Sequence, residues 1–183
     1  MILNKEKIIS NFSGSAESYD RHAILQKEMA DEIFTLAEKE NPSRILDIGC
    51  GTGYLTTRLA KHFPAAEVVG IDIAPGMIEY ARRKSDTKNL IFAVGDGEGL
   101  AFSKHSFDLV VANASFQWMR LGPVMSEVKR VLRPRGKLLF NTFGPDTLRE
   151  LKASHFKVNS FVPGIKIKAA LAKKFNKINV KSW

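Results

Sequence analysis

The sequence predicts an α/β protein built on a doubly wound, mostly parallel sheet, and three observations favour this fold class. Short apolar runs typical of strands alternate with amphipathic stretches typical of helices between residues 44 and 143. Closely spaced glycines follow the first of these runs, where a strand would pass into a helix. Acidic residues end the second and third runs, at the edge where open α/β sheets bind ligands.

The chain before the sheet is predicted to be helical. Residues 4–12 and 22–39 carry apolar residues three and four positions apart, as on one face of a helix. The sequence Asn-Pro-Ser at 41–43 ends this pattern. The expected units are a helical lid at 1–40, a ligand-binding core at 41–153 and a lysine-rich C-terminal segment at 154–183.

The core is predicted to alternate strands with helices, which implies parallel strands and right-handed crossovers. Its expected strands are 44–48, 67–72, 90–95, 107–113 and 137–143. Its expected helices are 53–63, 74–84, 122–132 and 145–153. The pattern weakens beyond residue 155, where a helix at 165–175 and a last strand at 176–183 are expected.

Composition limits the class of protein. Of the 183 residues, 44% are hydrophobic and 26% are charged, as in a folded globular domain. No apolar run approaches the ~18–20 residues of a membrane span. The N-terminus lacks the apolar core of a secretory signal, and Cys50 is the only cysteine, so no internal disulfide can form. We expect a cytoplasmic protein that has no metal site and does not bind membranes.

The excess positive charge is confined to the end of the chain. Residues 1–150 carry 20 basic and 19 acidic residues, whereas residues 151–183 carry eight lysines and no acid. These lysines could dock an acidic protein or form a solvated tail. Basic clusters at 82–84 and 129–137 fall at helix ends opposite the expected ligand edge, where they complement helix dipoles. We therefore expect no nucleic-acid binding.

The stretch Leu-Asp-Ile-Gly-Cys-Gly-Thr-Gly, residues 46–53, holds the first candidate ligand site. Glycines at 49, 51 and 53 permit a tight turn and let a ligand approach bare backbone at a helix N-terminus. The lysine of a phosphate-binding loop is missing, and the third glycine comes one residue earlier than in the dinucleotide fingerprint. Asp47 precedes the turn, and Cys50 is expected to be small rather than reactive.

Two more acids stand at the ends of the next strands. Asp72 lies 19 residues after Gly53, where a carboxylate can accept hydrogen bonds from a ribose diol. Asp96 ends the third strand and can accept from an adenine amine, with Gly97 leaving room. Helix capping and turn formation would explain each acid separately. Their joint placement favours a nucleoside ligand.

With these motifs, residues 40–143 resemble the class I S-adenosylmethionine-dependent methyltransferases. The resemblance implies that Asp47 and the glycine turn face the methionine part of the cofactor, Asp72 the ribose and Asp96 the adenine. Acids suit this cofactor because its sulfonium is a cation. The cofactor-binding residues implied are Gln26, Asp47, Gly49, Gly51, Gly53, Asp72, Ile73, Met77, Asp96, Gly97 and Asn113.

Three further segments, 12–26, 113–119 and 141–151, are similar to the malonyl-[acyl-carrier-protein] O-methyltransferases of biotin synthesis. The matching residues are Phe12, Tyr19, Asp20, Ala23, Gln26, Asn113, Gln117 and Trp118. Trans-aconitate methyltransferases and assembly factors of a respiratory complex share part of these motifs. Methylation of another small carboxylate, or a non-catalytic binding or assembly role, therefore stays open.

The resemblance implies an enzyme that esterifies the free carboxylate of malonyl-acyl carrier protein or malonyl coenzyme A. We expect a monomer. A carboxylate with a pKa near 4 is already ionised at pH 7, so neither His22 nor His105 is assigned as a base. The candidate catalytic residues are Tyr19, Gln117, Trp118 and Arg149. Packing would also explain Tyr19 and Trp118, and a solvated helix would explain Arg149.

The stretch 19–26 is expected to cover the cofactor, with Tyr19 inside, Arg21 outward and Gln26 near the methionine end. The resembled fold has seven strands, of which the last two form an antiparallel hairpin. Only five firm strands and one weak strand are predicted here, so we expect an incomplete hairpin. An unpaired sheet edge would then favour self-association.

Overall fold

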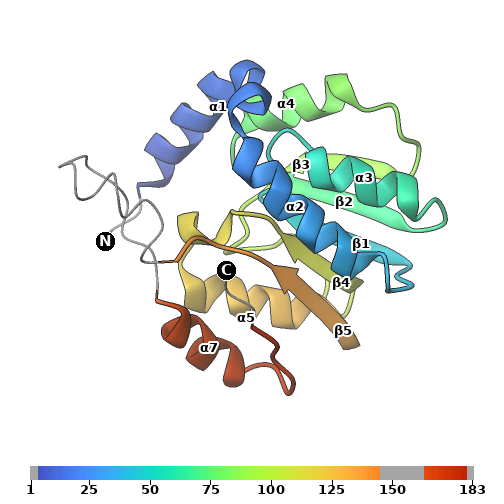
Figure 1. The fold of residues 1–183 in the computed structure, drawn as a ribbon, viewed down its shortest axis with the longest axis vertical. Helices are drawn as coiled ribbons and strands as arrows, with labels where there is room; N and C mark the ends of the chain where they lie inside the picture. The colour runs from blue at the N-terminus through green and yellow to red at the C-terminus, as the bar shows by residue number, and fades with distance from the viewer. Residues whose placement is uncertain (1–3, 145–162, 181–183) are drawn as a thin grey trace.

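The computed structural model describes residues 4–144 and 163–180, and its centre is a five-stranded sheet (Figure 1). The strands are β1 (Arg44–Ile48), β2 (Glu67–Asp72), β3 (Leu90–Val94), β4 (Phe107–Ala112) and β5 (Leu132–Phe140). Their order is β3-β2-β1-β4-β5, and every neighbouring pair is parallel. The predicted α/β fold is therefore confirmed. The order reverses between β1 and β4, where open sheets of this kind bind ligands.

Helices cover both faces of the sheet (Figure 1). The described helices are α1 (Lys5–His22), α2 (Ile24–Ala37), α3 (Tyr54–His62), α4 (Pro75–Lys84), α5 (Leu121–Val131), α7 (Gly164–Ala172) and the 3-10 turn η1 (Phe116–Trp118). None of the helices described is long and apolar enough to span a membrane.

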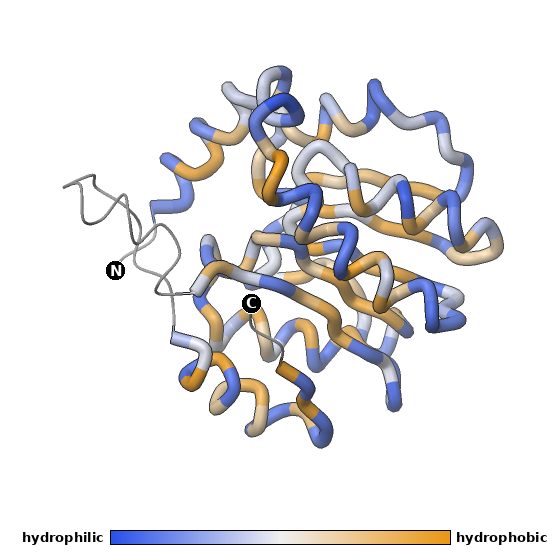
Figure 2. Tube along the Cα trace, viewed as in Figure 1, coloured by the Kyte–Doolittle hydropathy of each residue, from blue (hydrophilic) through white to orange (hydrophobic). Residues whose placement is uncertain are grey.

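Alternate residues of the strands form two separate cores. Ile45, Val68 and Leu109 face the apolar residues of α2 and α3. Leu46 and Val69 face the opposite layer, formed by α5 and α7. Figure 2 shows hydrophobic residues along the central strands, as expected where helices cover both faces of a parallel sheet. The sheet is thereby held between two layers, which leaves its carboxyl edge as the place for a site.

The first helix is longer than predicted. The expected helix at 4–12 continues to His22, despite a serine- and glycine-rich stretch of low helix propensity. The reason is tertiary packing, because Phe12, Ala16 and Tyr19 lie three and four residues apart and pack against α4. The two helices approach so closely that a Cβ on Gly76 would lie 2.7 Å from the Ser13 carbonyl oxygen.

Ala23 joins α1 to α2, and we call these two helices the lid. Asn4 caps the start of the lid, since its side-chain oxygen accepts from the Lys7 amide at 3.0 Å. The junction at Ala23 has a backbone conformation outside the helical region, which turns the chain between the helices. The residues around this junction point to the carboxyl edge of the sheet, as the next subsection describes.

The last strand begins five residues earlier than predicted. Phe107 pairs with Leu132 and Leu109 pairs with Lys137, so a bulge in β5 takes up the extra residues. Arg133 stabilises this bulge by donating to both carboxylate oxygens of Asp108, at 2.9 and 3.0 Å. The Arg-Pro-Arg-Gly sequence therefore lies inside the strand instead of preceding it.

The C-terminal segment differs in part from its prediction. The expected helix at 165–175 is confirmed as α7, although it ends at Ala172. The strand predicted at 176–183 is wrong for its described part, because residues 176–180 pair with no strand. Phe175 and Ile178 instead pack against the core under α5. The helix predicted at 145–153 lies outside the described residues, and the described strands include no antiparallel pair.

Candidate active site

The glycine turn forms one wall of the site. Gly49 and Gly51 have φ angles of 75° and 54°, in the region that favours glycine. The amides of Gly49 and Cys50 donate to the Ile71 carbonyl at 2.8 and 2.9 Å, which holds the turn across the end of β2. Gly53 has another role, since a Cβ there would lie 2.6 Å from the Phe92 ring. It lets α3 pack onto the sheet and does not line the cavity.

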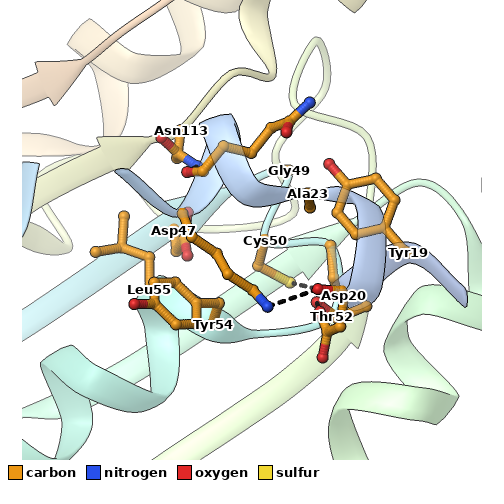
Figure 3. Close-up of a pocket in the computed structure, with 13 residues that line it drawn as sticks. Tyr19, Asp20, Ala23, Asp47, Gly49, Cys50, Thr52, Tyr54, Leu55 and Asn113 are labelled. Atoms are coloured by element: carbon orange, nitrogen blue, oxygen red, sulfur yellow. Dashed lines mark hydrogen bonds between the residues drawn. The ribbon is translucent and has the colours of Figure 1, made fainter. Parts of the chain in front are cut away.

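A cavity lies between this turn and the lid (Figure 3). Tyr19, Ala23 and Gln26 come to it from the lid, as the sequence predicted for Tyr19 and Gln26. The complete lining is Tyr19, Asp20, Ala23, Gln26, Lys27, Asp47, Gly49, Cys50, Gly51, Thr52, Tyr54, Leu55 and Asn113. Residues more than 80 positions apart in the chain thus surround one space at the carboxyl end of β1.

Asp47 is the buried acid of this cavity. It is 1% exposed, its Oδ2 accepts from the Thr56 hydroxyl at 2.6 Å, and its Oδ1 has no hydrogen-bond partner. Burial raises the pKa of Asp47 to about 7, and the Asp72 charge adds to this effect although the Thr56 hydrogen bond opposes it. An unpartnered buried acceptor beside a cavity calls for a donor, and a cation would satisfy it best.

Asp72 ties the glycine turn to the end of β2. Its Oδ2 accepts from the Gly51 amide at 3.0 Å, and its Oδ1 accepts from the Ala74 amide at 2.9 Å. Burial raises the pKa of Asp72, and these backbone hydrogen bonds only partly offset the rise. The carboxylate therefore has the local turn role that the sequence allowed. It also lies beside the turn where a ligand would approach.

Asp96 has a partner that sequence reasoning missed. Lys5, in the first turn of α1, places its ammonium 2.6 Å from Asp96 Oδ2 and 3.3 Å from Glu98 Oε2. Nothing in the spacing of the sequence could have paired residues 91 positions apart. Gly97 is closely packed, since a Cβ there would lie 2.7 Å from Ile48 and 2.8 Å from the Met119 sulfur.

Asp20, which was matched only as part of a motif, fastens the lid to the glycine turn. Its Oδ1 accepts from the Thr52 hydroxyl at 2.6 Å, and its Oδ2 accepts from the Lys84 ammonium. Burial alone would raise the pKa of Asp20, but Lys84 and Thr52 lower it overall. Its side chain is only 13% exposed. Lid, turn and α4 therefore meet at one carboxylate.

The basic cluster at 82–84 was predicted to lie away from the ligand edge. This is wrong for Lys84, because its side chain reaches back along α4 to Asp20, a residue that lines the cavity. Arg82 donates instead to the Phe92 carbonyl at 2.6 and 3.0 Å. In the second cluster, Arg130 pairs with Glu127 at 2.7 Å.

We expect the Asp20–Thr52 contact to stabilise the fold measurably. Asp20→Ala and Thr52→Val should each lower the free energy of unfolding. Either change alone removes the hydrogen bond to the charged carboxylate, so the loss in the double variant should be smaller than the sum of the single losses by about 1–2 kcal/mol. Urea denaturation of the two single variants and the double variant measures this coupling. Strictly additive losses would show that the contact does not stabilise the lid.

The loop after β4 contributes Asn113 directly and other residues indirectly. Asn113 Nδ2 donates to the Gln26 carbonyl at 2.9 Å, while its Oδ1 accepts from Asn141 at 2.9 Å. The Gln117 amide is held locally, as it donates to the Ala114 carbonyl at 2.6 Å and accepts from Thr142 at 3.0 Å. Neither Gln117 nor Trp118 is among the cavity-lining residues.

Aromatic rings nevertheless connect Trp118 to the cavity. The Trp118 and Phe12 ring centroids lie 5.5 Å apart, and the Phe12 and Tyr19 centroids lie 6.2 Å apart, both edge to face. Met77 is 1% exposed and packs under α1. Neither Met77 nor Ile73 is among the cavity-lining residues. Arg149, the remaining candidate, lies outside the described residues.

Within residues 4–144 and 163–180, no cluster of three or more His, Cys, Asp or Glu side chains could hold a metal ion. A ring nitrogen of the exposed His22 lies 3.0 Å from the Ser18 carbonyl oxygen, within its own helix. The polar side chains that line the cavity are carboxylates, hydroxyls, amides, the Cys50 thiol and the Lys27 ammonium.

The sequence that forms this site matches a known protein family. The family model described as a methyltransferase domain matches residues 45–136, from β1 into β5. The chain belongs to the methyltransferase domain family. The matched part of this methyltransferase domain contains the glycine turn, Asp47, Asp72 and Asp96.

Curated relatives extend the similarity beyond that domain. The chain is 41% identical over 157 residues to the malonyl-[acyl-carrier protein] O-methyltransferase of Acetivibrio thermocellus, covering 84% of this chain and 55% of that protein. It is also 41% identical over 151 residues to the enzyme of the same name from Hahella chejuensis, covering 82% and 54%. The chain thus spans about half the length of these relatives.

Solved structures show the same fold. A complex of the Haloferax volcanii Trm112 methyltransferase activator with a putative methyltransferase has a TM-score of 0.73 at 23% identity, over 89% of this chain and 75% of that one. Geranyl diphosphate C-methyltransferase from Streptomyces coelicolor, solved with S-adenosyl-L-homocysteine, has a TM-score of 0.66 at 18% identity, over 79% and 58%.

Proposed function

We propose that this methyltransferase domain binds S-adenosylmethionine and esterifies the free carboxylate of a malonyl thioester, as in biotin synthesis. The observation that carries the proposal is the unpartnered, buried Asp47 oxygen beside the glycine turn. The names of the curated relatives support malonyl-acyl carrier protein as the acceptor. Malonyl coenzyme A, which carries the same malonyl thioester, is the alternative acceptor. We further propose a cytoplasmic monomer that binds neither nucleic acid nor membranes.

The residues present fit this cofactor. Asp47 offers an acceptor to its α-ammonium group, and the glycine turn lets its methionine part approach the backbone. Asp72 would hold the ribose, and Asp96 with Gly97 would border the adenine. The other residues proposed for cofactor binding are Gln26, Gly49, Gly51, Gly53, Ile73, Met77 and Asn113. Six of the proposed residues do not line the described cavity, namely Gly53, Asp72, Ile73, Met77, Asp96 and Gly97. Of these, Gly53 and Met77 would act through packing.

S-adenosylmethionine, when bound, supplies a methyl group on a positively charged sulfur that leaves as a neutral thioether. The acceptor carboxylate is ionised at neutral pH, so the protein needs no general base. Its work is to place the carboxylate in line with the methyl group and to exclude water. The lid closes over the cavity, and Tyr19, Gln117, Trp118 and Arg149 are proposed to orient the acceptor.

The test uses labelled S-adenosylmethionine with four samples: malonyl-acyl carrier protein, malonyl coenzyme A, trans-aconitate and no acceptor. We expect a labelled methyl ester with a malonyl thioester and none in the last sample. Ester formation only with trans-aconitate would replace the proposed acceptor. Calorimetric binding of S-adenosylhomocysteine without any ester product would favour a non-catalytic role.

We expect Tyr19→Phe to slow methyl transfer more than it weakens cofactor binding. Burial, with the charges of Asp72 and Asp20, raises the pKa of Tyr19, so its hydroxyl remains a donor at neutral pH. Loss of one such donor should lower the single-turnover rate about tenfold. The dissociation constant of S-adenosylhomocysteine should change little in calorimetry. Tyr80→Phe is the matched control, because Tyr80 packs in the same apolar cluster but does not line the cavity. Equal rates for Tyr19→Phe and the unchanged protein would show that the Tyr19 hydroxyl takes no part in methyl transfer and that the side chain only packs.

A further inference from the structure

Two charged side chains in the cavity have capacity for a ligand. One is Asp47, whose Oδ1 has no partner. The other is Lys27, whose ammonium donates to the Asp20 carbonyl oxygen at 2.6 Å and lies 5.7 Å from the centroid of the Tyr54 ring. An ammonium has three donors, and the hydrogen bond described for Lys27 uses one of them.

The remaining charge in the lining is already engaged. The two carboxylate oxygens of Asp20 accept from Thr52 and Lys84, as described above. Among the cavity-lining residues, Lys27 is therefore the only base and Asp47 the only acid with an unpartnered oxygen. One acid and one base on the wall of one small cavity fit a ligand group that carries both charges, such as an α-amino acid.

The start of α3 adds to the positive side of this arrangement. Tyr54 and Leu55, its first two residues, line the cavity beside Lys27. The N-cap of this helix is Gly53, which has no side chain to accept from the first amides. Helix N-termini attract anions, so the helix start and Lys27 favour negative charge at the same wall.

We propose that Lys27 binds the carboxylate of the amino-acid end of the cofactor, opposite the ammonium held by Asp47. The inference rests on the proposed function, since it assumes an S-adenosyl amino acid as the ligand. It makes Lys27 a specificity residue that distinguishes this cofactor from adenosyl compounds without a carboxylate. It also explains the position of the helix junction at Ala23 over the glycine turn. Lys27 lies in the first helical turn of α2, directly after this junction, and is thereby brought to the cavity.

A pair of ligands separates this role from a structural one. S-adenosylhomocysteine has the carboxylate, and its decarboxylated analogue has the same adenosyl group, sulfur and ammonium without it. Calorimetry of both ligands gives a ratio of dissociation constants for each variant. We expect the unchanged protein to bind S-adenosylhomocysteine about 10- to 100-fold more tightly, the range for one charge-assisted hydrogen bond.

Three variants complete the experiment. Lys27→Met should bring the ratio close to one, and Lys27→Arg should keep most of it. Lys84→Met is the matched control, because Lys84 also contacts Asp20 from outside the cavity lining. It can weaken both ligands through the lid but should leave their ratio unchanged.

The outcomes distinguish the two proposals. An unchanged ratio of dissociation constants in Lys27→Met would overturn the inference but not the proposed function. The inference would be overturned in the same way if Lys27→Met left this ratio unchanged and instead raised the KM for the malonyl thioester. Failure of the unchanged protein to bind S-adenosylhomocysteine would contradict the proposed function and the inference with it. A ratio that collapses in Lys27→Met and survives in Lys84→Met supports both.

Discussion

Asp47→Asn is expected to abolish S-adenosylhomocysteine binding and to stabilise the ligand-free protein at pH 8. The pKa of Asp47 is about 7 in the folded protein, against 3.8 for an ordinary aspartate. Between these values the folded state binds more protons than the unfolded state, so stability falls as the pH rises. Above pH 7 Asp47 is ionised in both states, and its burial then lowers the free energy of unfolding by about 4 kcal/mol, which corresponds to a rise of about three pKa units.

Asparagine removes this penalty and keeps an acceptor for Thr56. The gain in the free energy of unfolding should therefore be about 2–3 kcal/mol larger at pH 8 than at pH 5. Urea denaturation at both pH values measures this difference, and calorimetry measures the loss of the ligand. Asp31→Asn, at an exposed carboxylate paired with Arg58, is the control. A gain that does not depend on pH would mean that Asp47 titrates like an exposed acid.

The same pKa predicts how ligand affinity varies with pH in the unchanged protein. An ammonium ligand is bound by the ionised form of Asp47, which loses its charge as the pH falls through about 7. The dissociation constant of S-adenosylhomocysteine should therefore rise toward tenfold for each pH unit below that value. Buried acids that cost stability and are satisfied by a ligand are typical of functional sites.

The parts of the site that follow from sequence are those set by local pattern. Asp47, the glycine turn and Asp72 lie within 26 residues of each other. They stand at the ends of two strands, each of which is predicted by a short apolar run in the sequence. Parallel strands bring their carboxyl ends to one edge, so the order of strands and turns is enough to place these residues together. Gln26 and Tyr19 were placed over the edge by resemblance to a family rather than by pattern.

The parts that sequence reasoning missed depend on tertiary contacts. Lys5 contacts Asp96 and Lys84 contacts Asp20 across 91 and 64 positions, with no periodicity to connect them. The length of α1 was underestimated for the same reason, since packing on α4 outweighs the low propensity of its serines and Gly14. Lys27 was overlooked because a lysine next to an acid on a helix is usually only a solvated residue.

Gly49→Ala is expected to cost more stability than the same change at Gly51, although both glycines have positive φ angles. An alanine at either position pays about 1–2 kcal/mol for the left-handed backbone. At Gly49 the new Cβ would also lie 2.4 Å from the Ser115 Cβ and 2.9 Å from its Oγ. Ser115 cannot easily move, because it is 7% exposed and donates to the Ile48 carbonyl at 2.7 Å. We expect a further ~1–3 kcal/mol from this overpacking.

A Cβ on Gly51 would meet no atom within 4 Å, but Gly51 lines the cavity. Gly51→Ala should therefore weaken S-adenosylhomocysteine binding while the fold survives, whereas Gly49→Ala should lower the urea midpoint most. Combining Gly49→Ala with Ser115→Gly removes the close contact, so this double variant should be more stable than the sum of its single losses. Equal losses at both glycines, with no recovery in the double variant, would show that the backbone angle alone demands glycine. The close approach of Ser115 would then not explain why the turn begins with a glycine at position 49.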